Sequence, residues 1–483
     1  MSSFKHFHLS FSLYHFRICA KQPVPYLFDL RYYTNMKVIV IGSGGREHAI
    51  CWKIAESSLV SEVVCIPGNG GTQHENKCRN LNPADCPAAS GLSGADALAA
   101  AAIAEKCDLA VIGPEDPLAA GIADKLWAAG IPVVGPCTDG ARLEASKDEA
   151  KAFMKKYGVA CAESDTFTDI EKAHAYIDAK GAPIVIKADG LAAGKGVVVA
   201  ATKDEAHKAV DDFMKDGLLG NAGKRLVIEE YLKGVEISIL AAVSVTPEFA
   251  AAGKACIIPF TTARDHTRLN DGAKGPNTGG MGAISPVSDV TPDQLVQFND
   301  NILEPTLKGL IAEKYDYRGF IFFGIMLTAA GPKLLEYNVR LGDPETQAVL
   351  PLMNFDFAAM CKAITEGTLK DFDFRWKKGF VCAPVAVSGG YPGSYKKGME
   401  ISGVLGASGA SCAESTKVFI AGAQDKDGKL VTSGGRVLAA SAFAPTFDEA
   451  WKKSYELLGK ISFDGMFFRK DIGLPGAAES GDL

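Results

Sequence analysis

Residues 183–200, PIVIKADGLAAGKGVVVA, decide the fold, because their pattern is strand, glycine-rich loop and strand. The first apolar run ends at Lys187, and a second lysine, Lys195, lies in the loop. Glycines let backbone N–H groups approach phosphate oxygens, and lysines add point charges. The loop glycines are Gly190, Gly194 and Gly196. The stretch predicts a flap that covers a polyphosphate.

This flap is not a Walker A loop, which requires G-x-x-x-x-G-K-[ST] leading into a helix. Here Gly196 stands in place of the serine or threonine, and residues 197–199 continue as a β-branched strand. An ordinary glycine hairpin with solvated lysines has the same pattern. The motif alone leaves that alternative open.

Composition restricts the function classes. A chain of 483 residues is too long for one hydrophobic core and predicts three or four domains. The net charge of −6 argues against broad nucleic-acid binding, so any anion site must be local. The 12 scattered cysteines favour reduced core thiols over metal or disulfide pairs. No apolar run approaches a membrane span. We therefore expect neither a nucleic-acid nor a membrane partner.

Residues 1–35 differ from the rest, because they are basic, aromatic and nearly free of acids. Such a leader can be an organelle transit peptide. Alternatively, Met36 is the true start, since the strand sequence VIVIG begins two residues later. We favour the second interpretation and expect residues 1–35 to be disordered, with import into an organelle left open.

Strand and helix patterns alternate over residues 36–137. Strands are expected at 38–41, 63–66, 109–112 and 133–134, and helices at 47–57, 95–106 and 117–129. This alternation predicts an N-terminal Rossmann-like domain with a parallel sheet covered by helices. A central α+β module is expected at 138–365, with a small lid subdomain at about 159–230. A small mixed C-terminal domain is expected at 370–473.

Four further elements are expected inside these units. The central module should contain helices over 203–214 and 292–312 and a β-hairpin that pairs 319–328 with 333–338. The C-terminal domain should carry one helix, over 446–458.

Residues 334–345, LLEYNVRLGDPE, contain a polar stripe. Alternate residues of a strand share a face, so Glu336, Asn338 and Arg340 should point the same way. Carboxylate and amide oxygens suit Mg²⁺, and a guanidinium can hold a carboxylate or phosphate with two hydrogen bonds. A solvent-facing strand is the alternative, but the GDPE turn that follows adds two more acids to the same neighbourhood.

The glycine-rich loop 265–282 is polar yet conformationally permissive. It suits a loop that wraps a small substrate, although a surface linker has similar composition.

The first strand–turn–helix, residues 41–48, resembles a dinucleotide fingerprint but fails it, because Glu47 occupies the third glycine position. We expect instead an anion cradle at a helix N-terminus, with Arg46 beside it, that suits a lone sugar phosphate. The next two strands end in PGNGGT (67–72) and GPED (113–116), where open α/β sheets bind ligands. His48 is expected to pack or hydrogen-bond rather than bind a metal.

The ordered set GSGGREHA, PGNGGT, GPEDPL, LEASK, PIVIKADGLAAGKGV, IEEYLKGVE, GPNTGGMGA and LLEYNVRLGDPE resembles the glycinamide ribonucleotide synthetases, the phosphoribosylamine–glycine ligases of the ATP-grasp superfamily. The resemblance covers about residues 36–473. It implies an ATP-grasp central module and a ligase of purine biosynthesis that joins glycine to 5-phosphoribosylamine through glycyl phosphate. It also implies ATP, Mg²⁺ or Mn²⁺, a cytoplasmic location, and a monomer or weak homodimer.

The resemblance also implies roles for individual residues. Arg340, Asp265 and Lys187 would be catalytic, and Glu336 and Asn338 would bind the metal. ATP would be held by Lys147, Lys187, Gly190, Gly194, Lys195, Gly196, Glu229, Glu230, Leu232 and Glu236. The other substrates would be held by Gly44, Gly45, Arg46, Asn69, Gly71, Thr72, Glu115, Asp265, Arg340 and Gly342.

The chain departs from the family at a few positions. The family usually has QDHKR where this chain has RDHTR, residues 264–268, so Arg264 and Thr267 differ. Both changes lie around the start of the glycine-rich loop 265–282, which is expected to wrap the substrate. Glu149 replaces a common aromatic residue, and Ile420 replaces a usual histidine.

Three rival functions can be set against this reading. Another ATP-grasp carboxylate–amine ligase or carboxylase would share the flap but not readily the GPNTGGMGA loop. A non-catalytic nucleotide sensor would bind ATP without turnover. An NAD dehydrogenase is disfavoured by the failed fingerprint.

Overall fold

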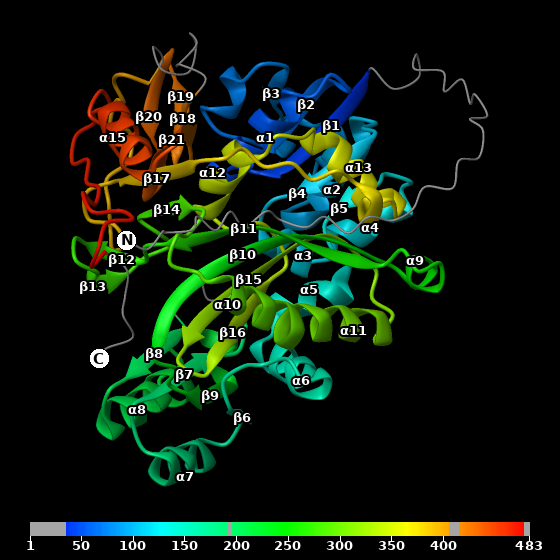
Figure 1. Cartoon of the computed structure of the whole chain (residues 1–483). Coiled ribbons are helices and arrows are strands. Elements are labelled where there is room, and N and C mark those ends of the chain that lie inside the picture. The colour runs from blue at the N-terminus through cyan, green and yellow to red at the C-terminus, as the bar shows by residue number, and fades with distance from the viewer. Residues whose placement is uncertain (1–34, 191–195, 405–414, 478–483) are drawn as a thin grey trace, which may run out of the picture.

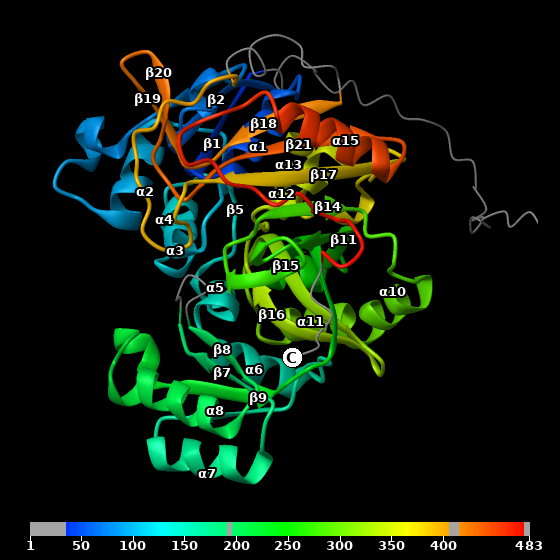
Figure 2. The same cartoon turned by 90° about the vertical axis from the view of Figure 1, so that its left-hand side faces the viewer.

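The computed structural model describes residues 35–190, 196–404 and 415–477. The N-terminal part (blue) and the C-terminal part (orange to red) lie side by side over one end of the central sheet, and a smaller unit lies beyond its other end (Figures 1 and 2). Leader residues 1–34 and the flap residues Gly194 and Lys195 lie outside the described residues.

The N-terminal part is a five-stranded parallel sheet in the order β3–β2–β1–β4–β5, which confirms the predicted Rossmann-like topology. Its central strands are buried on both faces, as expected for β-branched runs between helices. The strands are β1 (Met36–Gly42), β2 (Val60–Pro67), β3 (Cys78–Asn80), β4 (Leu109–Ile112) and β5 (Val133–Val134). The helices are α1 (Gly45–Ala55), α2 (Gly94–Ala104), α3 (Glu115–Ala119) and α4 (Ile122–Ala128).

The single helix expected over 117–129 is wrong. Gly121 adopts a positive φ of 77°, which ends α3 and begins α4. α3 begins at Glu115, three residues after β4 ends at Ile112. The Glu115 side chain can therefore reach a ligand at the edge of the sheet.

The smaller unit, which we call the lid, is a four-stranded antiparallel sheet in the order β6–β9–β7–β8 with two helices. It comprises β6 (Ser164–Phe167), α7 (Ile170–Lys180), β7 (Ile184–Ala188), β8 (Val197–Ala200), α8 (Lys203–Val210) and β9 (Leu226–Glu230). Ile184, Phe213 and Ile228 belong to a hydrophobic cluster of the lid alone. A unit with its own core can move as a body.

The central sheet has eight antiparallel strands in the order β16–β15–β10–β11–β14–β17–β21–β18. Its central-module strands are β10 (Gly234–Val245), β11 (Cys256–Asp265), β14 (Gly282–Ser285), β15 (Tyr317–Thr328) and β16 (Gly331–Asn338). β15 and β16 form the predicted hairpin. α5 (Thr138–Ala145) and α6 (Lys147–Tyr157) connect the N-terminal part to the lid.

The C-terminal part continues the same sheet through β14, which pairs with β17. Its strands are β17 (Phe380–Val387), β18 (Thr416–Ile420) and β21 (Arg436–Ala444), and a separate hairpin is formed by β19 (Ala423–Lys426) and β20 (Lys429–Thr432). The predicted C-terminal helix is α15 (Phe447–Leu458). α12 (Glu345–Val349) and α13 (Phe357–Glu366) link the two parts.

Two predicted helices contain a π-helical turn. The stretch expected as one helix over 292–312 is α10 (Pro292–Phe298), a π-turn at Asn299–Leu303 and α11 (Glu304–Ala312). In the lid, α8 passes into a π-turn at Asp211–Lys215. A turn of this kind often marks a functional position.

The N-terminal part and the central sheet share one hydrophobic core. Ile39 of β1, Phe153 of α6 and Phe323 of β15 belong to the same buried cluster. A shared core holds the two parts in a fixed relation, so residues that face one another across their boundary can form a site.

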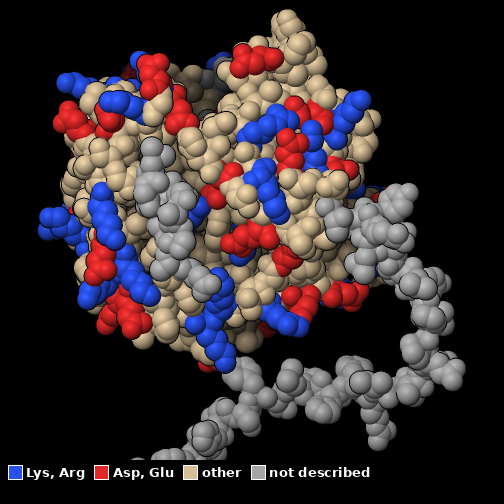
Figure 3. Space-filling model, turned by 90° about the horizontal axis from the view of Figure 1, so that it is seen from above, with Lys and Arg blue, Asp and Glu red and all other residues tan. Residues whose placement is uncertain are grey.

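On the face seen in Figure 3, positive and negative side chains are interspersed. None of the helices in the three described ranges is long and apolar enough to cross a membrane.

Candidate active site

A cavity of about 520 Å³ lies between the N-terminal part, the edge of the central sheet and the lid. This volume is typical of a small-molecule site. Nine residues singled out in the sequence line it: Arg46, Glu115, Lys147, Lys187, Gly190, Gly196, Glu336, Asn338 and Arg340. Segments from all three units therefore meet here.

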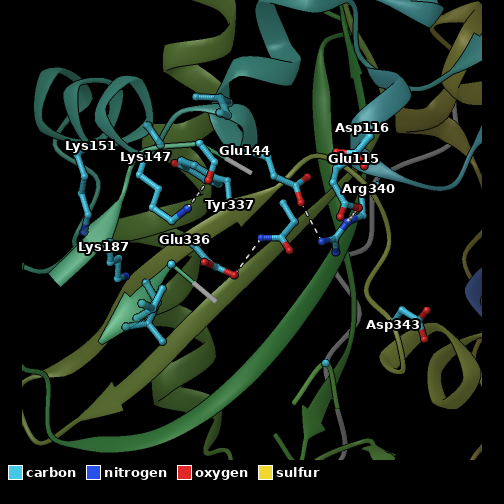
Figure 4. A pocket seen from close by; sticks show the side chains of 18 of the residues that line it. Glu115, Asp116, Glu144, Lys147, Lys151, Lys187, Glu336, Tyr337, Arg340 and Asp343 are labelled. Carbon is cyan, nitrogen blue, oxygen red and sulfur yellow. Dashed lines mark hydrogen bonds and ion pairs between the residues drawn. The ribbon is translucent and has the colours of Figure 1, made fainter. Parts of the chain in front are cut away.

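Three lysines lie at one end of the cavity, and Arg340 with its carboxylate partners lies at the other, with Glu336 between them (Figure 4). Ser146 separates α5 from α6, and its hydroxyl caps α6, so Lys147 is the first residue of that helix. Lys147 Nζ donates to the Gly190 carbonyl at 3.0 Å. Burial lowers the pKa of Lys147. This end of the cavity suits phosphate groups.

Glu229 of β9 pairs with the other two lysines of that end and leaves the trio with a net positive charge. Its carboxylate pairs with Lys187, and with Lys151 Nζ at 2.5 Å. Burial alone would lower the pKa of Lys187, but Glu229 and Glu336 raise it overall. Burial likewise would raise the pKa of Glu229, which Lys187 and Lys151 lower overall. Lys187 and Glu229 therefore form a charged pair at neutral pH.

Glu336 and Asn338 form an oxygen-rich patch in the middle of the cavity. Both project from β16 into the cavity, while Tyr337 between them is 2 % exposed and packs in the core, as the period of two predicts. Asn338 Nδ2 donates to Glu336 Oε1 at 3.2 Å, so the amide oxygen is not used in that contact. A carboxylate and an amide oxygen beside a cationic phosphate site fit Mg²⁺ or Mn²⁺.

Arg340 is fixed by two carboxylates. Its Nη2 lies 2.8 Å from Glu144 Oε1, and its Nε lies 3.1 Å from Glu115 Oε2. Glu144 also accepts the Val339 N–H at 2.7 Å. Burial raises the pKa of Glu144 to about 7, against the opposing effect of Arg340. The guanidinium is thus held in one orientation with donors left for a ligand.

A second cavity, of about 620 Å³, opens at the carboxyl ends of the parallel strands, where the sequence placed a ligand. Gly44, Arg46 and Asp343 line it, and Arg46 and Asp343 also line the first cavity. The two cavities therefore share a wall of opposite charges.

The N-terminus of α1 differs from the expected anion cradle. Glu47 Oε2 accepts the Gly44 N–H at 2.6 Å, and Glu47 Oε1 lies 2.5 Å from Arg46 Nε. A carboxylate therefore occupies part of the space in which a dinucleotide pyrophosphate would lie. This geometry argues against the NAD alternative.

Asn69, Gly71 and Thr72 hold the loops rather than line either cavity. Asn69 Nδ2 donates to the carbonyls of Ser43 at 2.9 Å and Ile420 at 2.8 Å, and its Oδ1 accepts the Gly71 N–H at 2.7 Å. Thr72 is fully buried. Gly45 and Gly342 leave no room for a side chain. A Cβ added at Gly45 would lie 2.6 Å from Gln347, and a Cβ added at Gly342 would lie 2.4 Å from Glu345.

His48 is the hydrogen-bonding residue that the sequence predicted. Its Nδ1 accepts the Ile420 N–H at 2.8 Å, and its Nε2 lies 3.1 Å from Glu75. Lys417 pairs with the same carboxylate at 2.7 Å. Ile420, which stands in place of the family's usual histidine, thus anchors the C-terminal part to α1 through its backbone.

The GPNTGG loop reaches the first cavity through Gly279. Arg436 of β21 binds the Gly279 carbonyl, the Asp343 carbonyl at 2.7 Å and the Asp343 carboxylate at 3.3 Å. One arginine from the C-terminal part therefore joins the glycine-rich loop 265–282 to the GDPE turn.

Asp265 does not line the first cavity and instead lies behind Gly280. A Cβ on Gly280 would lie 2.6 Å from Asp265 Oδ2. Burial and the Glu345 carboxylate raise the pKa of Asp265 well above its usual range. Glu236 and Asp265 both line a separate small pocket with Arg264.

Two departures from the family pattern lie in the loop region 264–267, and the side chain of the first is locally satisfied. Arg264 makes a two-pronged pair with Asp289, at 3.0 and 2.9 Å. The Thr267 carbonyl accepts two hydrogen bonds from Thr278, which close the glycine-rich loop 265–282.

The residues that line the first cavity without an assigned role in the sequence include Glu144, Lys151 and Arg436. Glu144 belongs to the LEASK motif, and Arg436 belongs to an SGGRVL motif in the C-terminal part. Four described residues that were assigned to ATP lie outside the lining: Glu229, Glu230, Leu232 and Glu236. Glu230 is paired with Lys333 at 2.8 Å.

His266, next to Asp265, gives a testable pH dependence. Its Nδ1–H donates to the Gly282 carbonyl at 3.1 Å, and its Nε2 accepts the Gly473 N–H at 3.0 Å, so the ring is neutral. Burial lowers its pKa to about 4. As the pH falls, His266 therefore binds a proton in the unfolded state before it does so in the folded state. The contribution of the neutral His266 ring to the free energy of unfolding is complete above about pH 6.5. It is lost as the pH falls towards 4, by up to about 1.4 kcal/mol per pH unit.

We expect the urea midpoint of the wild type to fall more steeply than that of His266→Asn between pH 6.5 and 4.5. The two slopes must be compared because Glu144, whose pKa is raised, increases the stability of the folded state as the pH falls over part of that range. Parallel slopes in wild type and His266→Asn would contradict the assignment.

Comparisons with known proteins follow the same division of the chain. Three family models match: phosphoribosylglycinamide synthetase N domain over residues 36–144, its ATP-grasp (A) domain over 145–346 and its C domain over 381–475. The phosphoribosylamine–glycine ligase of Clostridium acetobutylicum is 49% identical over 91% of this chain and 99% of that protein. The ligase of Halalkalibacterium halodurans is 44% identical over 92% and 98%.

Solved structures agree. The phosphoribosylamine–glycine ligase from Thermotoga maritima has a TM-score of 0.74 at 35% identity and covers 90% of this chain and 100% of its own. A biotin carboxylase domain from Hydrogenobacter thermophilus has a TM-score of 0.65 at 16% identity, covers 90% of this chain and 92% of its own, and shares the fold.

Proposed function

The chain belongs to the phosphoribosylglycinamide synthetase family of ATP-grasp enzymes, and from that premise we propose how its residues join glycine to 5-phosphoribosylamine. The protein is an ATP-dependent carbon–nitrogen ligase of purine biosynthesis. One observation carries the residue assignments: a single cavity holds cations at one end, a carboxylate–amide pair in the middle and a fixed guanidinium at the other end.

The reaction has two steps. An oxygen of the glycine carboxylate attacks the γ-phosphorus of ATP, ADP leaves, and glycyl phosphate forms. The nitrogen of 5-phosphoribosylamine then attacks the glycyl carbonyl carbon, inorganic phosphate leaves, and the nitrogen loses a proton to solvent. Such phosphoryl transfer requires mainly positioning and charge neutralisation from the protein.

Lys147 and Lys187 supply that positive charge at the ATP phosphates, with Gly190 and Gly196 bordering the same end. The Glu229–Leu232 segment would contact the adenine through its backbone and Leu232, because the Glu229 carboxylate is held by two lysines. Glu236 would bind the ribose. Gly194 and Lys195 complete the flap in this proposal.

Glu336 and Asn338 would hold the divalent ion, Mg²⁺ or Mn²⁺, which when bound neutralises charge on the phosphates. Arg340 would receive the glycine carboxylate, since Glu144 and Glu115 fix its orientation and leave donors free. Asp265 would pair with the glycine ammonium, whose positive charge lowers the pKa that burial has raised.

The second cavity would hold 5-phosphoribosylamine. It lies at the carboxyl ends of β1 and β2 and shares Arg46 and Asp343 with the first cavity, so the amine can reach the acyl phosphate. Gly44, Arg46 and Glu115 would contact this substrate. Asn69, Gly71, Thr72, Gly45 and Gly342 would position those contacts.

Closure of the lid would shield glycyl phosphate from water. The lid has its own hydrophobic core and carries Lys187 and the flap, so its movement would carry the phosphate ligands with it. We further propose that the enzyme is cytoplasmic, acts on these small molecules without nucleic acid or membrane, and is a monomer or weak homodimer, which sedimentation analysis can check.

The test is ADP release, measured with each substrate omitted in turn. We expect release only when ATP, glycine and freshly made 5-phosphoribosylamine are all present with Mg²⁺. Release that depends on bicarbonate instead of glycine would favour the carboxylase alternative. Labelled oxygen from the glycine carboxylate should appear in the released phosphate; its absence would rule out the acyl phosphate.

Gly280→Ala tests the link between the loop and Asp265. The new Cβ would lie 2.5 Å from Pro344 Cδ and 2.6 Å from the Asp265 carboxylate, at a φ of +114°. We expect a rise of about tenfold or more in the KM for glycine, because Asp265 is displaced, and a stability loss of about 1–3 kcal/mol.

The matched control is Gly181→Ala, which has a φ of +85° but no atom within 4 Å of the added Cβ. It should lose stability without a change in the KM for glycine. An unchanged KM in Gly280→Ala would remove Asp265 from the glycine site.

A further inference from the structure

We propose that the lid carries a second metal site, for a divalent transition-metal ion, with His174 of α7 and His207 of α8 as its protein ligands. The two Nδ1 atoms lie 2.6 Å apart, and the ring centroids lie 4.8 Å apart. The histidines thus direct ring nitrogens at one another from neighbouring helices. Neither residue lines the cavities of the active site.

The opposite nitrogen of each ring is anchored by a carboxylate. His174 Nε2 lies 3.1 Å from Asp211 Oδ1, and His207 Nε2 lies 3.1 Å from Asp178 Oδ1. Each Nε2–H donates to its carboxylate, which leaves both Nδ1 atoms for a shared partner. Histidines that bind metals almost always donate their other ring N–H to a carboxylate or carbonyl in this way.

The arrangement is built by the same pattern on both helices. Residues 174–178 are HAYID and residues 207–211 are HKAVD, so each helix presents a histidine and an aspartate four residues apart on one face. The pairs cross, because each histidine bonds the aspartate of the other helix. Ala173, Ile177, Ala206 and Val210 pack in the lid core beneath them.

The π-turn that follows α8 contributes to this geometry. It begins at Asp211, whose carboxylate receives the His174 ring. α7 and α8 lie on the side of the lid sheet turned away from the rest of the molecule (Figures 1 and 2). An ion bound there would join two helices of the lid without entering the active site.

A metal fits with a small displacement. Zinc–nitrogen bonds are about 2.0–2.1 Å, so two nitrogens on one tetrahedral ion lie about 3.4 Å apart. The distance between the two Nδ1 atoms, 2.6 Å, would therefore increase by less than 1 Å. Both side chains are accessible, at 23 % and 28 % exposure. Both Nδ1 lone pairs would then bind the ion, and any proton held between the two Nδ1 atoms would leave to solvent.

The donor set selects the class of ion. Imidazole nitrogen suits Zn²⁺, Cu²⁺ and Ni²⁺, whereas Mg²⁺ prefers oxygen. Within the described ranges no three His, Cys, Asp or Glu side chains are placed to bind one ion, so water would complete the coordination. Lys208 is paired with Asp212 at 2.7 Å, which reduces its repulsion of the ion.

The test is a calorimetric titration of ZnCl₂ into the full chain without an affinity tag, in millimolar Mg²⁺ to occupy the oxygen ligands of the active site. We expect one saturable Zn²⁺ site per chain. His174→Gln and His207→Gln should each remove it. Asp178→Asn, which changes an exposed side chain, should weaken it by about 10–100-fold.

His74→Gln is the matched control, because His74 pairs with Asp425 at 2.9 Å but faces no second imidazole. It should leave the titration unchanged, and circular dichroism should confirm that every variant is folded. Zn²⁺ should also raise the melting temperature of the wild type but not of His207→Gln. No saturable binding to the wild type, or equal binding to both histidine variants, would show a proton-sharing pair without a metal and overturn the proposal.

Discussion

Replacing Arg340 by methionine should lower kcat/KM for glycine-dependent ADP release by about 10²–10³-fold and the free energy of unfolding by about 3–5 kcal/mol. The guanidinium lies 2.8 Å from Glu144 and 3.1 Å from Glu115. Its removal leaves the Glu144 carboxyl, which is 9 % exposed, without its cation. Activity falls for a separate reason, because the proposed partner of the glycine carboxylate is lost.

The two effects can be separated with Glu144→Gln. The double variant Arg340→Met/Glu144→Gln replaces the unpaired carboxyl with an amide, so we expect it to recover much of the stability lost in Arg340→Met but none of the activity. Denaturant unfolding measures the first quantity, and ADP release at saturating ATP measures the second.

Arg318→Met serves as the control for loss of a partly buried arginine, since Arg318 pairs with Asp316 and stacks on Trp127 outside the cavity. It should lose stability with kcat/KM nearly unchanged. Recovery of activity in the Arg340→Met/Glu144→Gln variant would show that Arg340 acts only by neutralising Glu144 and does not contact glycine.

The local part of the site could be predicted from sequence because strand geometry has a fixed period. Glu336, Asn338 and Arg340 alternate with apolar residues, and all three line the cavity while Val339 is 1 % exposed. The parallel sheet followed from alternating strands and helices in the same way. These inferences used only neighbours in the chain.

Contacts between distant segments could not be predicted in this way. Glu144 meets Val339 across 195 positions, and Arg436 meets Asp343 across 93. Nothing in the local pattern around either residue identifies its partner. The continuation of the central sheet through β14 into the C-terminal part is equally non-local.

Loop residues present a third case. Asn69, in the PGNGGT turn, was expected to bind substrate because of the family resemblance. Its side chain instead joins carbonyls of Ser43 and Ile420 across the boundary between two units. An amide has as many uses in holding a loop as in binding a ligand, and composition does not distinguish them.

The oxygen ligands give the second large effect. Asn338→Ala should raise the Mg²⁺ concentration for half-maximal activity by about tenfold or more and lower kcat, because one of two proposed protein ligands is removed. Stability should fall by only about 0.5–1.5 kcal/mol, since the visible loss is one hydrogen bond to Glu336. Magnesium titrations of ADP release measure the first effect.

Asn299→Ala is the matched control, because Asn299 also donates to a neighbouring acid, Asp300, at 3.1 Å. Asn299 belongs to the π-turn after α10 and lines neither the first nor the second cavity. Its magnesium dependence should equal that of the wild type. Glu336→Gln should shift the dependence in the same direction as Asn338→Ala, since a carboxylate binds the ion more strongly than an amide. If Asn338→Ala lowers kcat while the magnesium dependence stays constant, Asn338 orients Glu336 and is not itself a ligand.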